Sequence, residues 1–234
     1  MKEILMGVIS FAGAVGIRIA WGVVRSRRRK LALSELAKQL DWTLHAGRLK
    51  LPDVPFFAGK ANPRADNVME GSESGLRALM FDYLYDQEMS DPEGGTSTVT
   101  RIRTIAAFSS LQHELPSFAL KKKRLLSESR DRVEVLGQPG FIKRQVLTGK
   151  DKASISSLFD PQLVTFLGRA SRNERLCLEG AGSWLVFYYE NAIGQGKRLS
   201  PKKWAGFLQE ASQIATGFFQ IAAKTAASSV TSAA

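Results

Sequence analysis

Residues that could carry out chemistry are few in this sequence, and they do not form a recognisable site. The two histidines, His45 and His113, have no second His, Cys or Asp at a spacing typical of metal ligands. Residues 71–75 (GSESG) have glutamate where a nucleophile elbow needs serine, so they are predicted to form a hairpin turn. An unrecognised hydrolase with a pocket near His113 or Cys177 is therefore the least favoured interpretation.

The remaining motifs are also better explained by structure than by catalysis. Residues 194–198 (GQGKR) lack the full spacing and the Ser or Thr of a phosphate-binding loop, so a turn is predicted. Cys177 is the only cysteine, which excludes an intramolecular disulfide and agrees with a reducing cytoplasm. It is expected on a strand between two leucines, where a thiol is rarely a nucleophile. The sequence thus predicts a protein that is not an enzyme, with no catalytic residues, metal or cofactor.

The first thirty residues predict a membrane anchor. Residues 4–24 are mostly apolar and carry one charge, Arg18, and 21 helical residues span about 31 Å, close to the thickness of a hydrocarbon core. A cleaved signal peptide would carry its positive charges before the apolar segment, whereas here they follow it. By the positive-inside rule, the N-terminus lies outside and the rest lies in the cytoplasm of a bacterium, at the inner membrane. The residues predicted at the membrane interface are Arg18, Trp21, Arg25, Arg27, Arg28, Arg29 and Lys30.

Small residues recur within this predicted membrane helix. Ala12, Gly16 and Ala20 are four residues apart, a pattern that lets transmembrane helices approach each other closely. The predicted partners are therefore membrane lipids together with another membrane helix, either a second copy of the chain or a different subunit.

The basic composition does not by itself indicate nucleic-acid binding. The formal net charge is +11, and residues 1–30 contain seven Lys or Arg against a single Glu, so over half of the excess is next to the predicted membrane segment. A second basic cluster at residues 121–124 is followed by acidic residues and has no aromatic residues for base stacking. Residues 137–140 (GQPG) match the Gly-x-x-Gly loop of some RNA-binding domains, but the helices that flank that loop are missing. No nucleic-acid partner is predicted.

Residues 31–224 are predicted to form one cytoplasmic α+β domain, between an anchor at 1–30 and a flexible tail at 225–234. A short helix fits residues 31–40, and a proline-rich loop that contains Phe56 and Phe57 should plug the core. Residues 67–85 indicate a hairpin, and residues 98–110 a further strand that would bring Asp82 near Arg101. Further strands are expected around Phe118 and at residues 133–136, 142–147, 175–179 and 184–189.

The helices of this domain have recognisable start signals. Asp151 can cap a helix at residues 152–158, and Asp160 precedes Pro161, a favoured first helical residue. Ser200 and Pro201 begin the longest soluble helix, whose apolar residues share one face. The predicted fold class is therefore α+β, with one N-terminal transmembrane helix, a mainly antiparallel sheet, short helices and a packed C-terminal helix.

Several landmarks resemble a family of uncharacterised bacterial membrane-anchored proteins. They are FDYLY at 81–85, TIAAF at 104–108, LPSF at 115–118, VLTGKD at 146–151 and LEGAGSWLVFYY at 178–189. The resemblance covers residues 31–222 and departs at Lys121 and Lys122, where the family pattern has Pro-Glu. It implies a membrane helix followed by a domain of unknown function, and it implies no catalytic residues.

The leading functional hypothesis is a non-enzymatic accessory or scaffold subunit that docks a cytoplasmic domain on a larger membrane complex, for example a photosynthetic or respiratory one. It rests on the absence of catalytic motifs together with the small-residue pattern at Ala12, Gly16 and Ala20. The alternative is a membrane-anchored domain that senses a ligand or lipid, favoured by the aromatic-rich strands and the basic segment at residues 25–30.

Overall fold

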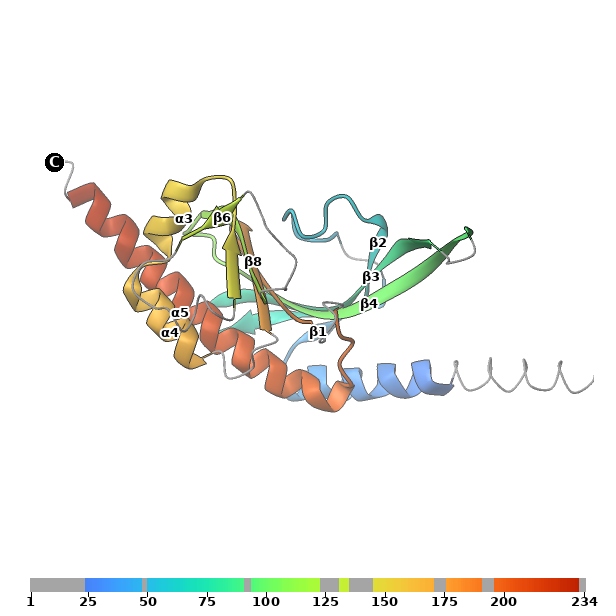
Figure 1. Cartoon of the computed structure of the whole chain (residues 1–234). Coiled ribbons are helices and arrows are strands. Elements are labelled where there is room, and N and C mark those ends of the chain that lie inside the picture. The colour runs from blue at the N-terminus through green and yellow to red at the C-terminus, as the bar shows by residue number, and fades with distance from the viewer. Residues whose placement is uncertain are drawn as a thin grey trace, which may run out of the picture.

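An antiparallel sheet organises the part of the chain that the computed structural model describes, residues 24–47, 50–90, 94–122, 131–134, 145–170, 176–190 and 196–231. The nine strands found there follow the order β1-β2-β3-β4-β9-β8-β5-β7-β6, and every pair is antiparallel (Figure 1). They are β1 (Thr43–Leu44), β2 (Ala61–Glu73), β3 (Leu76–Ser90), β4 (Thr96–Ser109), β5 (Leu115–Lys122), β6 (Arg132–Val133), β7 (Gln145–Thr148), β8 (Leu176–Gly182) and β9 (Trp184–Tyr189).

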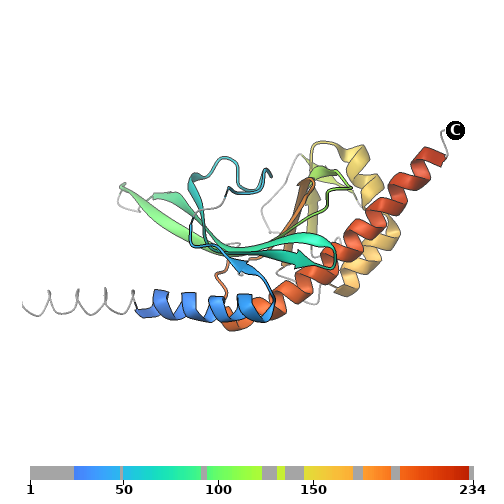
Figure 2. The ribbon, with the colours of Figure 1, turned by 180° about the vertical axis from the view of Figure 1, so that it is seen from behind.

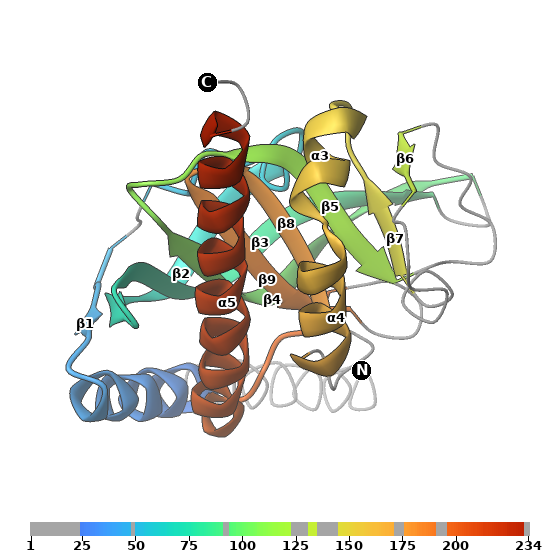
Figure 3. The same ribbon diagram turned by 90° about the vertical axis from the view of Figure 1, so that its left-hand side faces the viewer.

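Helices cover one face of this sheet (Figure 3). Residues 24–39, called here the N-terminal helix, precede the strands. The others are α3 (Lys152–Leu158), α4 (Pro161–Ala170), the short 3-10 turn η1 (Pro201–Lys203) and α5 (Trp204–Thr231). The predicted caps are confirmed, because Asp151 accepts a hydrogen bond from the amide of Ser154 and Asp160 accepts one from that of Leu163. Helix α5 continues beyond residue 224, the predicted domain boundary.

The alternation of side chains along β3 separates two apolar clusters. Ala78 and Met80 pack against the helices, whereas Leu79 and Phe81 face the other side of the sheet. There the loop before β2 covers the strands, opposite α5 and the N-terminal helix (Figure 1). Phe56 and Phe57 are buried in this loop, which confirms that they plug a core, and the core is this second cluster.

The predicted hairpin between β2 and β3 is confirmed, and Ser74 and Gly75 both have positive φ at its turn. The predicted register of β3 and β4 is wrong, because Asp82 lies opposite Thr104 and not opposite Arg101. Both strands extend into the polar segment between them, β3 up to Ser90 and β4 from Thr96. The turn is not centred on that segment, so the register differs from the predicted one.

The predicted fold class is wrong in its transmembrane helix. Among the residues that the structure describes, no helix is both long enough and apolar enough to cross a membrane. The described helices instead bury one apolar face and carry charged or polar residues on the other. Of the predicted span at residues 4–24 only Val24 is described. Ala12, Gly16, Ala20, Arg18 and Trp21 lie outside the described residues.

Candidate anion-binding groove beside a buried aspartate

A fully buried carboxylate, that of Asp82, lies on the face of β3 that the helices cover. Arg29 of the N-terminal helix binds it with two hydrogen bonds, of 2.8 Å from Nε to Oδ2 and 2.7 Å from Nη2 to Oδ1. Arg198 donates from Nη2 to Oδ2 at 3.0 Å. A carboxylate in the interior needs such partners, because removing an ion from water costs several kcal/mol. Asp82 therefore ties three separate segments of the chain together.

Two neutral groups complete this arrangement, which we call the Asp82 cluster (Arg29, Asn67, Asp82, Thr104 and Arg198). The amide of Asn67 donates to Oδ2 at 2.9 Å, and the hydroxyl of Thr104 donates to Oδ1 at 3.1 Å. Asn67 has a φ of 54° at a bulge in β2, a backbone conformation that asparagine tolerates better than most residues. With two arginines around one aspartate, the cluster retains one positive charge.

Arg29 also fixes the N-terminal helix against the segment that precedes α5. Its Nη1 donates to the carbonyl of Leu199 at 2.8 Å, and its guanidinium lies 5.3 Å from the centre of the Trp204 ring. Figures 1 and 2 both show this helix beside the start of α5. The amide of Leu199 donates in turn to the hydroxyl of Thr104 at 2.8 Å. The helix therefore has a defined position beside the segment from Gly196 to Ser200.

An open groove of about 370 Å³ lies where this segment meets α5. Buried Leu199 and Phe207 form part of its apolar lining, and Gly206 leaves open space beside them. Lys197, Lys202 and Lys203 are exposed at its edge. We call this site the basic groove; its lining residues are Tyr189, Lys197, Leu199, Lys202, Lys203, Gly206 and Phe207.

The basic groove carries an uncompensated positive charge. Within the described part of the chain, none of Lys197, Lys202 and Lys203 forms an ion pair. Glu210, a neighbouring carboxylate on α5, accepts a hydrogen bond from the hydroxyl of Tyr189. Glu190 is buried at its bridge to Gly196, and Asp82 is outnumbered by its own arginines. Three ammonium groups around a partly apolar hollow match the chemistry of an anion with an apolar attachment.

Backbone hydrogen bonds hold the groove segment in place. The amide of Lys197 donates to the carbonyl of Tyr189 at 3.0 Å, and the carbonyl of Lys197 accepts from the amide of Thr104 at 3.1 Å. Gly196 packs so closely on Arg103 that an added Cβ would lie 2.0 Å from the Arg103 Cγ and Cδ atoms. The guanidinium of Arg103 lies within 5.6 Å of the ring centres of Phe56, Tyr85 and Tyr188. The groove is thus supported by the second apolar cluster.

The N-terminal helix presents a mixed apolar and basic surface next to the groove. Val24 and Leu31 are 46% and 71% exposed, and Arg28 lies between them on the same side, since residues at i, i+4 and i+7 share a helix face. Of the residues predicted at a membrane interface, Arg25, Arg27, Arg28 and Lys30 are exposed, whereas Arg29 is directed into the Asp82 cluster.

The other sequence candidates have structural surroundings. His45 pairs with Glu70 at 2.9 Å, and His113 stacks on the ring of Phe219. Cys177 is completely buried in the second apolar cluster. Within the described residues no group of three or more His, Cys, Asp or Glu could hold a metal ion.

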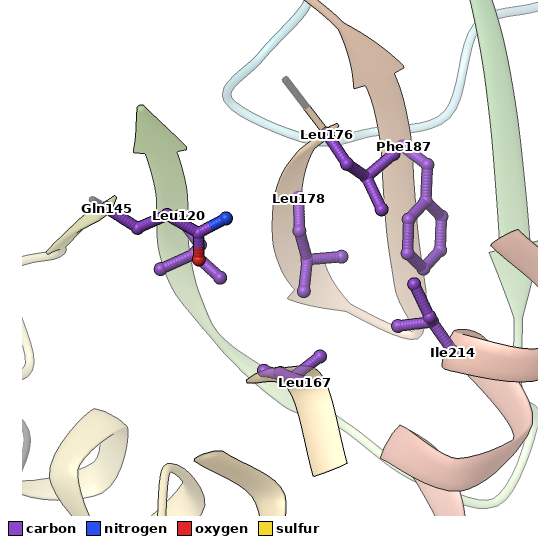
Figure 4. A pocket seen from close by; sticks show the side chains of 7 residues that line it. All are labelled: Leu120, Gln145, Leu167, Leu176, Leu178, Phe187 and Ile214. Carbon is purple, nitrogen blue, oxygen red and sulfur yellow. The ribbon is translucent and has the colours of Figure 1, made fainter. Parts of the chain in front are cut away.

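A small cavity between the sheet and helices α4 and α5 does not provide a ligand site (Figure 4). Its volume is about 10 Å³, about enough for one water molecule. Apart from Gln145 its lining is apolar, and Gln145 Oε1 is buried with no hydrogen-bond partner among the described residues. The lining residues are Leu120, Gln145, Leu167, Leu176, Leu178, Phe187 and Ile214.

Sequence reasoning missed the residues of the basic groove. The segment GQGKR predicts only a turn, and Ser200 and Pro201 predict only the start of a helix. A signal was present, because basic residues recur at positions 197, 198, 202 and 203 on both sides of the Ser-Pro start signal. This segment meets the N-terminal helix through contacts between residues more than 150 positions apart, such as Arg29 and Leu199. A local sequence pattern does not contain such contacts.

Comparison with known proteins identifies the fold only. No protein-family model matches the sequence, and no curated protein matches it. Among solved structures, the chain is similar to the mycobacterial trehalose monomycolate transport factor A, TtfA, with a TM-score of 0.52 and 15% sequence identity. The alignment covers 83% of this chain and 94% of that one. The two proteins share a fold, and the resemblance to a family of uncharacterised proteins stays a prediction.

Proposed function

We propose that this protein is a non-enzymatic accessory protein of lipid transport that acts at the cytoplasmic face of a bacterial inner membrane, in contact with anionic lipids and a membrane-protein partner. One observation carries the proposal. The N-terminal helix exposes Val24 and Leu31 among four basic side chains, and Arg29 anchors this helix to the folded domain.

The chemistry of this surface suits the headgroup region of a bilayer. Exposed apolar side chains gain free energy by entering the boundary between headgroups and acyl chains. Each Lys or Arg near an anionic membrane surface contributes about 1 kcal/mol of attraction. The cytoplasmic leaflet is the negatively charged one, which favours that side.

The role in lipid transport draws on the fold. TtfA, which has a similar fold, is named as a transport factor for trehalose monomycolate. A non-enzymatic role agrees with the packing of His45, His113 and Cys177, each of which is engaged in a pair, a ring stack or a core. A lipid-sensing role is the second candidate, and the basic groove favours it.

Vesicle flotation tests the proposal with the full chain. The protein should float with vesicles that contain phosphatidylglycerol more strongly than with neutral phosphatidylcholine vesicles. A variant with Arg25, Arg27 and Arg28 all changed to Gln should lose about 3 kcal/mol of attraction, roughly 100-fold in partitioning at low salt. Added salt should reduce the binding of the natural protein more than that of this variant.

A control variant has the same loss of charge near helices α3 and α4, which lie apart from the N-terminal helix (Figure 1). Lys150, Lys152 and Arg169 are exposed near α3 and α4, and changing all three to Gln should leave flotation unchanged. Every variant keeps the same first 23 residues, so a difference in flotation comes from the changed side chains. Equal binding of the arginine variant and the natural protein to anionic vesicles would therefore contradict the proposal.

A further inference from the structure

We propose that the basic groove is a specific site for a phosphate group that carries a small organic attachment. This inference deepens the proposed function and depends on it only for the natural source of the phosphate, which would be a phospholipid headgroup. The site is separate from the exposed arginines of the N-terminal helix, so the two proposals can fail independently.

The charge of the groove selects for an anion. Lys197, Lys202 and Lys203 provide three ammonium groups, each with three donors, and no carboxylate of the described chain pairs with them. Lysine binds phosphate as a compact point charge that does not need the planar geometry of arginine. A divalent cation would instead need carboxylate or carbonyl ligands in the place of these lysines.

The start of α5 adds to this preference. The 3-10 turn η1 leads directly into α5, and Ser200, the residue before η1, makes no side-chain capping hydrogen bond. Helix α5 has 28 residues, and the N-terminal end of such a helix favours negative charge. This effect supplements the lysines and the groove, which are the observations that carry the proposal.

The volume and lining indicate what the phosphate is attached to. A volume of about 370 Å³ exceeds the need of a bare phosphate and lies at the lower end of the range for small-molecule sites, about 300–1,000 Å³. Leu199 and Phe207 offer an apolar surface below the lysines, and Gly206 leaves space between the helix backbone and the opening. Glycerol phosphate, the headgroup unit of a phospholipid, has both the charge and the size.

The other charged groups that face this region leave the balance positive. Arg29 and Arg198 exceed the charge of Asp82 by one, and Glu210 is engaged by the hydroxyl of Tyr189. The buried Glu190, whose backbone pairs with Gly196, adds a second carboxylate near this segment, so the groove has three lysines and one residual arginine charge against two carboxylates. A phosphate diester, with one negative charge, leaves the site positive, and a monoester brings it closer to neutrality.

Calorimetric titration of the full-length protein in a neutral detergent tests the site. The ligand is sn-glycerol 3-phosphate, with glycerol as the uncharged control and the ionic strength held constant. We expect saturable binding of glycerol 3-phosphate and none of glycerol. Changing Lys197, Lys202 and Lys203 to Gln should weaken binding at least about tenfold, because charge-assisted hydrogen bonds are lost. The control in which Lys150, Lys152 and Arg169 become Gln should bind as the natural protein does.

A second variant separates a shaped site from diffuse attraction. Gly206→Leu leaves every charge in place and fills the open space beside Phe207, so it should abolish binding. Gly206→Ala adds only a methyl group in that open space and should retain binding. Both variants should fold, because replacing a helical glycine by a helix-forming residue is not destabilising where no other atom is close. Thermal unfolding of both variants checks this.

Two further arms distinguish the source of the phosphate. Vesicles with phosphatidylglycerol are compared with vesicles of equal surface charge made with oleate, which has no phosphate. A preference for phosphatidylglycerol that the groove variant loses would identify a lipid headgroup, whereas binding of glycerol 3-phosphate without that preference would identify a soluble phosphate ester. Failure to bind glycerol 3-phosphate, or equal binding by the lysine variant, would overturn the proposal. Loss of flotation in the arginine variant with retained phosphate binding would separate the two proposals.

Discussion

Replacing Asp82 by Asn tests whether the Asp82 cluster holds the N-terminal helix on the domain. The substitution preserves shape and removes the charge that faces two guanidinium groups. The side chain of Arg29 is only 11% exposed, so its charge would remain buried without a counter-ion. Breaking a buried ion pair by removing one partner costs about 3–5 kcal/mol.

The structure places the expected loss at the lower end of that range. Arg198 is 42% exposed and can turn its guanidinium toward water, so it contributes little to the loss. Arg29 keeps its hydrogen bond to the Leu199 carbonyl and its contact with the Trp204 ring. We therefore expect Asp82→Asn to lower the free energy of unfolding by about 3 kcal/mol.

A double-mutant cycle assigns this loss to the pair. Arg29→Met leaves Asp82 with Arg198, Asn67 and Thr104 as partners, so it should cost less than the loss of the aspartate. The two changes together should cost clearly less than the sum of the single changes, with a coupling of about 1–3 kcal/mol. Urea unfolding in neutral detergent measures all three, and Trp204 fluorescence reports the region because Arg29 lies over this ring.

Two results would refute this reasoning. A loss below about 1 kcal/mol for Asp82→Asn would mean that the guanidinium of Arg29 finds water or other partners, as it would at a protein surface. Additive single effects would mean that Arg29 and Asp82 stabilise the fold through separate contacts. In either case the N-terminal helix would not be positioned by this cluster.

Three further predictions concern stability alone. Asp160→Ala removes the N-cap of α4 and should lower the free energy of unfolding by about 1 kcal/mol in the same urea assay. Gly196→Ala should cost about 1–3 kcal/mol, because the new methyl group overlaps the Arg103 side chain, and a cost near zero would show that Arg103 can move away. Burial and the nearby Glu179 raise the pKa of Tyr188 well above its ordinary value. The un-ionised Tyr188 hydroxyl therefore contributes to the free energy of unfolding, and this contribution is fully present below about pH 10 and is lost at higher pH. Tyr188→Phe should therefore make alkaline unfolding less steep, as circular dichroism against pH can measure.

The sequence predicts those elements that depend on nearby residues. Asp151 and Asp160 cap the helices that follow them, and the Ser74–Gly75 turn joins two strands, because each signal acts within a few residues. The predicted strand position of Cys177 is confirmed in the same way, because Cys177 lies in β8 on the opposite face from Leu176 and Leu178.

The Asp82 cluster could not be predicted in the same way. Its members are separated by 53 and 116 residues along the chain, so only the folded sheet brings them together. The sequence does contain a partial signal, because Asp82 interrupts an apolar strand in which its neighbours Met80 and Leu84 are buried. A carboxylate at such a position requires a positive partner, but the strand pattern does not identify which of the 33 Lys and Arg supplies it.

The position of Arg29 connects the two proposed sites. Its guanidinium contacts both Asp82 and the carbonyl of Leu199, and Leu199 lines the basic groove. A helix whose exposed side meets anionic lipid would therefore bring the groove close to the same headgroups, where a phosphate could enter it. Arg29→Met should weaken this coupling, so that flotation through Arg25, Arg27 and Arg28 persists while the preference for phosphatidylglycerol over oleate declines. An unchanged preference would mean that the groove reaches the headgroups without the N-terminal helix in its present position.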